Sequence, residues 1–109
     1  MKWPCVIKHA DDDELVYLED LSTWEDDEEL QDFEYDQTDF LIDATGAVYG
    51  FESDGSSVVL VSRDRSMALN DVLGLVKAHA ATKGSCCVAK LYAPTILDAF
   101  IIVKSMDDE

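Results

Sequence analysis

One acidic stretch limits how this chain can fold more than any other feature. Residues 11–36, DDDELVYLEDLSTWEDDEELQDFEYD, contain fourteen Asp and Glu residues and neither Lys nor Arg. Carboxylates at that density repel one another, which opposes compaction, and they remain solvated unless a partner neutralises them. The pattern therefore predicts a charged surface segment beside a core that the rest of the chain supplies.

The overall charge disfavours two large classes of ligand. The chain has a net charge of −16 and only eight Lys and Arg residues, which form no run. Binding to the phosphates of nucleic acids or to anionic membranes depends on clustered basic side chains. We therefore expect neither direct nucleic-acid binding nor membrane binding.

Length and composition indicate one small domain. The chain has 109 residues, 48% of them hydrophobic, which suits a single domain over residues 1–109 with one modest core and a frayed acidic end at 107–109. No secretory signal is expected, because Pro4 and Lys8 interrupt the apolar stretch near the N-terminus. Three cysteines are an odd number, which is typical of a reducing compartment, so we expect a cytoplasmic location.

The first third of the chain is predicted to form two strands and one short acidic helix. Residues 3–9 alternate in polarity and residues 14–20 are rich in strand-forming types, so together they predict a hairpin. Ser22 followed by Glu25 is a capping-box pattern, which predicts a short helix within the acidic stretch.

A second hairpin is predicted over residues 39–52. Gly46 supplies the positive φ of the turn, and pairing of Ala44 with Ala47 would place four apolar side chains on one face. These four are Phe40, Ile42, Tyr49 and Phe51. The run VVLVS at 58–62 is apolar on both faces, which predicts a strand in the interior of the sheet.

The last third is predicted to contain two helices separated by a strand. Asn70 is expected to cap a helix that ends near Lys83, and Thr95 is expected to cap a helix over 96–106, with a strand over 85–93 between them. The element order is then β-β-(α)-β-β-β-α-β-α. We predict an α+β fold in which two main helices pack on one face of a mainly antiparallel sheet of about five to six strands.

Four motifs resemble a known family. The segments WP at 3–4, WEDD at 24–27, LIDATG at 41–46 and VKAHAATKGSCCVAKLYAPTILDAF at 76–100 are similar to a family of small acidic bacterial proteins described only as a domain of unknown function. The resemblance implies a compact α+β domain of bacterial, cytosolic origin. It implies no activity, cofactor or functional residue.

The groups that could carry catalysis or bind metal are poorly spaced for either. Residues 11–22 lack the central Gly of an EF-hand loop and place apolar residues at ligand positions. Cys86 and Cys87 are adjacent and would point to opposite sides of a strand, unlike the spaced pairs of zinc sites. His79 has no evident third group to complete a Cys–His nucleophile, so we expect it to be structural, and Cys5 to be a buried thiol. We therefore predict no catalytic residue, no metal and no cofactor.

The acidic stretch is the candidate binding surface. A basic protein would complement its charge, and its aromatic residues would anchor the contact. The candidate partner face consists of Trp24, Glu25, Asp26, Asp27, Glu28, Glu29, Asp32, Phe33 and Tyr35. Trp24 is suited equally to covering the core and to lying in an interface. The favoured function is a small non-enzymatic protein that binds another protein through this face.

Two alternative functions stay open from the sequence. An enzyme or small-ligand binder would have a pocket between the sheet and the helices, where a few polar groups converge. A nucleic-acid mimic would space its carboxylates like phosphates and compete with DNA for a basic partner. A solvated flank that binds nothing would have the same composition.

Overall fold

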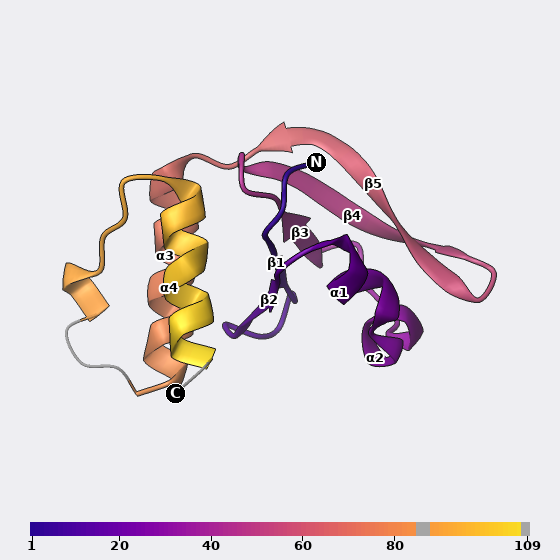
Figure 1. Ribbon diagram of the computed structural model, residues 1–109, viewed down its shortest axis with the longest axis horizontal. Coiled ribbons are helices and arrows are strands. Elements are labelled where there is room, and N and C mark those ends of the chain that lie inside the picture. Colours follow the sequence, from indigo (N-terminus) through magenta and orange to yellow (C-terminus); the bar gives the residue numbers. More distant parts are fainter. Residues whose placement is uncertain (85–87, 108–109) are drawn as a thin grey trace.

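The chain folds into a five-stranded antiparallel sheet with helices on both faces (Figure 1). The computed structural model describes residues 1–84 and 88–107. The elements in chain order are β1 (Cys5–Lys8), β2 (Leu15–Leu18), α1 (Leu21–Asp26), α2 (Glu28–Asp32), β3 (Phe40–Ile42), β4 (Ala47–Asp54), β5 (Ser57–Ser66), α3 (Leu69–Thr82), the 3₁₀ turn η1 (Val88–Lys90) and α4 (Ile96–Asp107). The strand order β2-β1-β3-β4-β5, with every neighbouring pair antiparallel, confirms the predicted α+β class.

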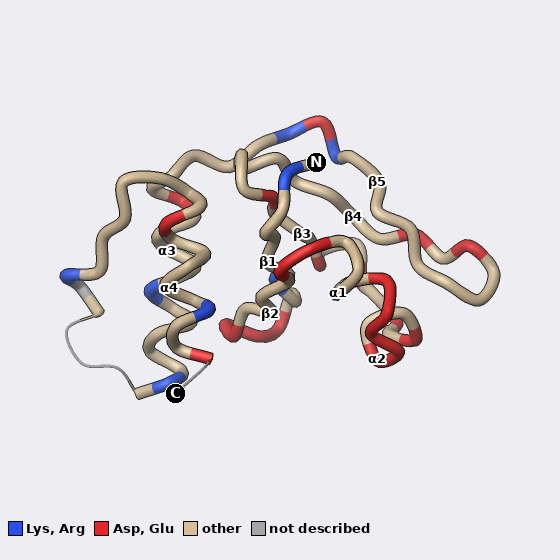
Figure 2. Tube along the Cα trace, in the orientation of Figure 1, with Lys and Arg blue, Asp and Glu red and all other residues tan. Residues whose placement is uncertain are grey.

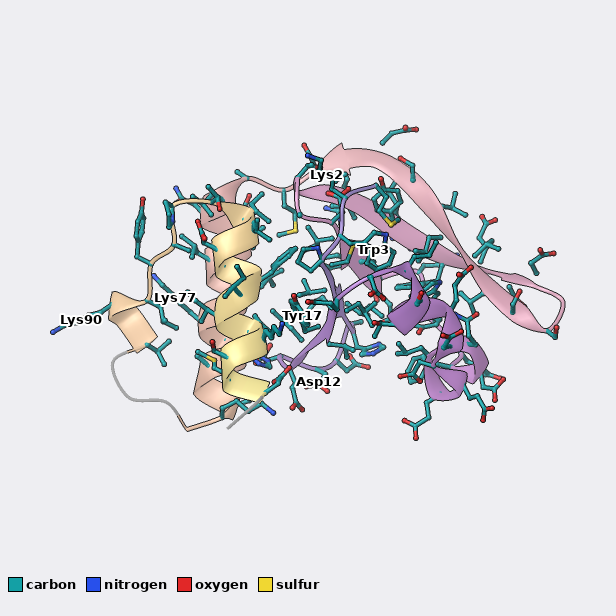
Figure 3. All side chains as sticks on the ribbon, in the orientation of Figure 1. Lys2, Trp3, Asp12, Tyr17, Lys77 and Lys90 are labelled. Carbon is teal, nitrogen blue, oxygen red and sulfur yellow. The ribbon has the colours of Figure 1, made fainter. Side chains whose placement is uncertain are left out.

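Side chains that alternate along the strands build two cores, one on each face of the sheet. In β1, Val6 packs toward α3 and α4, whereas Cys5 and Ile7 pack toward α1. The first core contains Val6, Leu15, Ile42, Val72, Leu73, Val76, Ala93, Ala99, Phe100 and Val103. The second core contains Cys5, Ile7, Leu18, Trp24 and Leu41. Tyr17 packs against the edge of the first core (Figure 3).

The second core changes the predicted role of the acidic stretch. The sequence placed helices on one face of the sheet and the acidic segment beside it, and the two long helices do share one face. The short acidic helices α1 and α2 cover the opposite face, because Trp24 is buried there with only 3% of its surface exposed. The acidic segment is therefore part of the packed structure.

The register of the β3–β4 hairpin differs from the prediction by one residue. Leu41 pairs with Tyr49 and Ile42 pairs with Val48, so Ile42 does not face Tyr49. The loop is longer than a two-residue turn, because the N–H of Asp43 donates to the carbonyl of Ala47 (3.0 Å). A shift of one residue moves a side chain to the other face. As a result Phe40 and Ile42 pack with the first core, whereas Tyr49 and Phe51 pack with the second.

The carboxylate of Asp43 holds this loop together. It is 1% exposed and accepts hydrogen bonds from the Thr45 hydroxyl (2.6 Å) and from the N–H groups of Thr45 (2.9 Å), Ala47 (3.0 Å) and Lys2 (3.1 Å). Burial raises the pKa of Asp43, but these four donors outweigh it and hold the pKa below its ordinary value. The loop, the N-terminal segment and the two central strands are thereby joined at one buried charge.

The strand predicted to lie in the interior of the sheet is an edge strand. Within residues 1–84 and 88–107, β5 pairs with β4 alone, and the hairpin that the two strands form projects past the helices α3 and α4 (Figure 1). Val58 and Leu60 pack toward the second core, whereas Val59 and Val61 are 39% and 36% exposed. The apolar run was misleading because, among the described residues, no helix covers the face of this arm that carries Val59 and Val61.

Helix side chains cap an N–H group on each edge strand. Nδ1 of His79, on α3, accepts from the N–H of Leu15 in β2 (2.9 Å). The Gln31 side chain, on α2, accepts from the N–H of Val58 in β5 (3.1 Å). Each bond satisfies one backbone N–H group of an edge strand. His79 is fully buried, so the structural role expected for it has a specific physical basis.

The last third differs from the prediction at two points. Ala68 is the N-cap of α3 and offers no side-chain hydrogen bond, so Asn70 is not the cap. Within the strand predicted over 85–93, residues 85–87 lie outside the described residues, and Val88–Lys90 form a 3₁₀ turn beside α3. The cap predicted for α4 is present, since the N–H of Asp98 donates to the Thr95 hydroxyl (3.1 Å).

Within the described residues, no helix combines the length and apolar composition that crossing a membrane requires.

Candidate protein-binding face

Two aspartates start the two short helices of the acidic segment. Asp20 is the N-cap of α1 and accepts from both the N–H and the hydroxyl of Thr23 (2.9 Å each). The capping box predicted at Ser22 is therefore wrong by two residues, since the cap lies further upstream. Asp27 ends α1 with an extended backbone and caps α2 by accepting from the N–H of Leu30 (3.1 Å). Two of the carboxylates in this segment therefore serve as helix N-caps.

Polar contacts fix the acidic segment to the sheet. The Gln31 amide donates to the carbonyl of Trp24 (3.0 Å) while its oxygen accepts from Val58, so one side chain links α1, α2 and β5. The Tyr35 hydroxyl donates to the carbonyl of Leu30 (2.8 Å). Burial raises the pKa of Tyr35, and the nearby carboxylates of Asp27 and Asp39 raise it further, which keeps the phenol a donor. The backbone of this segment is therefore fixed against the β4–β5 arm.

An aromatic cluster lies between the acidic segment and the β4–β5 hairpin. Tyr35 stacks on Phe51 with centroids 3.9 Å apart, and Trp24 contacts Phe51 at 5.7 Å. Phe33 lies 4.9 Å from Tyr35 and 4.7 Å from the ring of His9. Among the predicted aromatic anchors, Trp24 belongs to the core and Tyr35 is half-buried. Phe33 is 47% exposed and is the aromatic residue of this segment that presents most surface to solvent.

The carboxylates around Phe33 have no cationic partner within the described part of the chain. Residues 20–36 hold nine Asp and Glu residues. The ion pairs found among residues 1–84 and 88–107 are His9–Asp39, His79–Asp107, Lys83–Glu14, Lys83–Asp107 and Lys104–Glu19. Figure 2 shows the acidic residues gathered on α1, α2 and the turn before β2, whereas several lysines lie on the α3–α4 side. Charge in this protein is therefore polarised between its two helical layers.

Two hollows flank Phe33. The hairpin hollow, about 470 Å³, lies between the acidic segment and the β4–β5 arm. Its lining includes Asp32, Phe33, Tyr35, Phe51, Glu52 and Val58. The His9 hollow, about 390 Å³, lies at the turn between β1 and β2. Its lining includes His9, Asp12, Phe33, Glu34, Asp36 and Asp39. Phe33 and Glu34 line both hollows, so this pair forms the ridge between them.

The structure divides the nine predicted partner-face residues between surface and core. Trp24 is buried, Tyr35 is half-buried, and the remaining residues are exposed on or just after α1 and α2: Glu25, Asp26, Asp27, Glu28, Glu29, Asp32 and Phe33. The far walls of the hollows come from His9, Phe51 and Val58, which sequence reasoning did not select. Phe51 and Val58 lie on β4 and β5 and His9 follows β1, and no local pattern signals that a hairpin arm packs against the acidic segment.

The thiol and imidazole groups of the described residues lack the geometry of a reactive centre. Burial raises the pKa of Cys5 to about 12, and the Asp43 carboxylate contributes, so this thiol stays protonated. Nδ1 of His79 accepts from a backbone N–H, and its buried Nε2 lies 3.4 Å from the Asp107 carboxylate at the protein surface. Cys86 and Cys87 lie outside the described residues. Over the part of the chain that is described, no three His, Cys, Asp or Glu side chains are grouped to hold a metal ion.

Comparison with known proteins places this arrangement in a family. An NMR structure of a protein from Shewanella amazonensis superposes with a TM-score of 0.71 at 22% identity, covering 96% of this chain and 89% of that one. At that identity the likeness concerns the fold. No curated protein is similar enough to this chain to count as a relative. The DUF4144 family, described as a protein structure with unknown function, matches residues 3–103. The chain belongs to the DUF4144 family.

Proposed function

We propose that this protein binds a basic segment of another protein through the acidic face that surrounds Phe33. The observation that carries the proposal is an exposed aromatic side chain set among nine carboxylates without ion-pair partners in the described chain. Partly exposed aromatic residues are common anchors of protein interfaces. Unpaired negative charge attracts a positively charged partner and raises its rate of association.

The rigidity of the segment supports binding over simple solvation. A flank that only keeps a protein soluble needs no fixed geometry, whereas the Gln31 side chain joins α1 and α2 of this one to β5, and the Tyr35 hydroxyl bonds back to α2. A backbone that is already ordered loses little further conformational entropy when a partner docks, so more of the attraction remains as affinity. The proposed activity is binding without catalysis, which the protonated thiol of Cys5 and the enclosed imidazole of His79 favour.

A pair of variants with equal charge tests the site. Glu34→Gln removes an exposed carboxylate from the ridge between the hollows, and Asp71→Asn removes an exposed carboxylate in the first turn of α3. Both variants carry −15, because each changes the net charge of −16 by one. The probe is a peptide of alternating Arg and Leu residues, titrated at low ionic strength and followed by ¹⁵N amide shifts.

The expected result is a loss of affinity confined to the first variant. Since an exposed ion pair contributes about 0.2–1 kcal/mol, the loss should be roughly 1.4- to fivefold. Amide shifts in the parent protein should map to residues 24–36 and the β4–β5 arm. Equal weakening in the two variants would mean that the peptide responds to net charge alone, and the proposed face would then be wrong. Competition by duplex DNA for a basic protein partner would instead support the nucleic-acid mimic.

A further inference from the structure

We infer that two copies of this chain pair through the open edges of their β5 strands, with Val61 on the two-fold axis. β5 is the last strand of the sheet, and its outer edge lies along the rim of the molecule (Figure 1). Antiparallel pairing at this edge joins the sheets of the two copies into one continuous sheet. The pairing is independent of the proposed function, because it uses backbone groups of β5 and not the acidic face around Phe33.

The hairpin turn determines which backbone groups of β5 face the open edge. Asp54 and Ser57 pair across a two-residue turn in which Gly55 has φ +69°. The residues that close such a turn exchange hydrogen bonds with each other, and bonded and non-bonded residues then alternate along the strands. Every second residue of β5 therefore bonds to β4, and the residues between them direct their N–H and C=O groups to the open edge. These edge-facing residues are Val58, Leu60 and Ser62.

The two ends of this edge are closed, whereas its middle is open. At one end the Val58 N–H donates to the Gln31 side chain (3.1 Å), which agrees with the alternation. At the other end the regular pairing of β5 with β4 is interrupted after Ser62, where Asp64 has φ +53° and donates its N–H to the Ser62 hydroxyl (3.2 Å). The backbone groups of Leu60 and Ser62 are therefore the part of the edge that another strand can reach.

The open middle of the edge selects one two-fold register. When both open residues are used, Leu60 faces Ser62 of the second copy, and each of the two equivalent pairs exchanges two hydrogen bonds. Pairing Leu60 with its own copy would place Ser62 against the capped Val58. Pairing Ser62 with its own copy would place Leu60 against the irregular backbone at Asp64. In the selected register Val61 lies opposite Val61 of the second copy.

The side chains of β5 suit this register. Val59 and Val61 are 39% and 36% exposed, on the face of the arm that the described helices leave uncovered. Opposite residues that do not bond to each other in an antiparallel pair have Cα atoms about 4.5 Å apart, so Val61 contacts its own copy directly. β5 then has a neighbouring strand on each side. That is the interior position which its apolar run predicts.

The distribution of charge favours a second copy that runs antiparallel. Residues 55–63 contain no Asp or Glu, although the chain carries −16, so repulsion between two copies is weaker here than at the acidic segment. The tip half of β4 carries Glu52 and Asp54, and the far end of β5 carries Arg63 and Arg65. Within residues 1–84 and 88–107 neither arginine forms an ion pair. The register brings the arginine end of each copy beside the acidic tip of the other.

Sedimentation equilibrium of the full chain over a range of concentrations tests the pairing. Interfaces smaller than about 1,200 Å² are typically weak and transient, and two short strand edges form an interface of that class. We therefore expect a reversible dimer at high protein concentration. Added salt should strengthen the dimer, because two copies that each carry −16 repel one another at long range.

Two lysine variants of equal charge locate the contact. Val61→Lys should leave the protein monomeric, since a lysine on an edge strand opposes edge pairing and would face a second lysine across the axis. Ile101→Lys should still form the dimer, because Ile101 is 46% exposed on α4, away from β5. Both variants carry −15, so a difference between them does not arise from net charge.

Cross-linking through an introduced cysteine tests the register. Val61→Cys and Val59→Cys are compared under mild oxidation in a chain with Cys86→Ser and Cys87→Ser, in which the remaining Cys5 is buried. The register places the two Cα atoms of position 61 about 4.5 Å apart and those of position 59 about 14 Å apart. A disulfide requires Cα atoms within roughly 7 Å of each other, so Val61→Cys should form the covalent dimer at least about tenfold faster.

Three results would overturn pairing through β5. A parent protein that stays monomeric at high salt would leave the edge to an extended segment of a different protein. A dimer that survives Val61→Lys, or cross-linking that is as fast at position 59 as at position 61, would exclude the register. A dimer that salt weakens would indicate contact between the acidic face and the lysines of the α3–α4 side. The proposed basic-peptide site is tested separately by Glu34→Gln and stands or falls without these results.

Discussion

Replacing Asp43 with Asn tests whether one buried carboxylate organises the centre of the fold. The side chain is 1% exposed and accepts four hydrogen bonds, three of them from backbone N–H groups. Asn keeps an oxygen for the donors from Thr45 and Ala47, but those bonds become neutral and weaken by roughly half. The amide N–H₂ of Asn would then face the N–H of Lys2, so one acceptor is lost and two donors oppose each other.

The expected cost is about 2 kcal/mol of unfolding free energy, since a bond to a charged group contributes about 1.5–3 kcal/mol and an unsatisfied buried group costs about 1–3 kcal/mol, partly offset by relief of the buried charge. For a domain of this size that corresponds to a fall in Tm of roughly 10 °C. Urea unfolding followed by circular dichroism measures the free energy, and calorimetry measures Tm.

Asp36→Asn is the matched control. Asp36 accepts from the N–H and the hydroxyl of Thr38 (2.9 Å each), as Asp43 does from those of Thr45. Each of the two aspartates therefore begins a turn of the Asp-x-Thr type. Asp36 is exposed, and its substitution should change stability far less than that of Asp43. Equal effects of the two substitutions would refute the argument that burial makes the Asp43 bonds important.

The pH dependence of the Asp43→Asn variant has a definite sign. The pKa of Asp43 is lowered in the folded state, so its ionised form stabilises the fold at any pH above the unfolded-state value, near 3.8. That stabilisation is lost as the pH falls through the lower, folded-state pKa. The difference in unfolding free energy between the parent protein and the variant should therefore be constant from about pH 5 to about pH 7 and should shrink below about pH 4. A difference that widens with acidification would contradict the assignment.

Three further substitutions follow from the same structure. His79→Leu removes the acceptor of the Leu15 N–H and should cost about 1–3 kcal/mol in urea unfolding, whereas unchanged stability would show that water replaces the imidazole. Gly46→Ala should cost about 2 kcal/mol or more, because φ is +93° and the added Cβ would lie 2.5 Å from the Met67 carbonyl oxygen; Gly55→Ala, with φ +69° and open space around it, should cost clearly less in the same assay. Asp32→Asn should raise Tm modestly by relieving repulsion along α2, and added salt should reduce that gain; a gain independent of salt would exclude repulsion as its cause.

Local sequence patterns were sufficient to predict the elements that depend on neighbouring residues. The hairpin of β1 and β2, the long helix α3 and the Thr95 cap of α4 were readable, because alternation, helical spacing and cap residues act over a few positions. The predicted β3–β4 register was wrong by one residue, because the loop held by the buried Asp43 is longer than a two-residue turn. Turn preferences of the residue types do not indicate whether a side chain is buried.

Long-range packing decided the remaining elements and the site. VVLVS has the composition of a central strand, yet β5 lies at the edge, since strand position depends on which segments compete for each neighbour. For the same reason the sequence predicted only part of the face around Phe33. The acidic residues and Phe33 are contiguous in the chain, whereas His9, Phe51 and Val58 reach the hollows from three different strands or their ends.

The sequence by itself determined the charge and the α+β class, because these depend on composition and on periodicities that neighbouring residues share, and its motifs carried the resemblance to the family. Only the tertiary structure decided that Trp24 is core, that Phe33 is the exposed aromatic of the acidic segment, and that two hollows flank it. The physical reason is that burial is a property of three-dimensional neighbours. Trp24 and Phe33 have similar acidic neighbours in the sequence, and only their positions relative to the sheet determine which of the two side chains is buried.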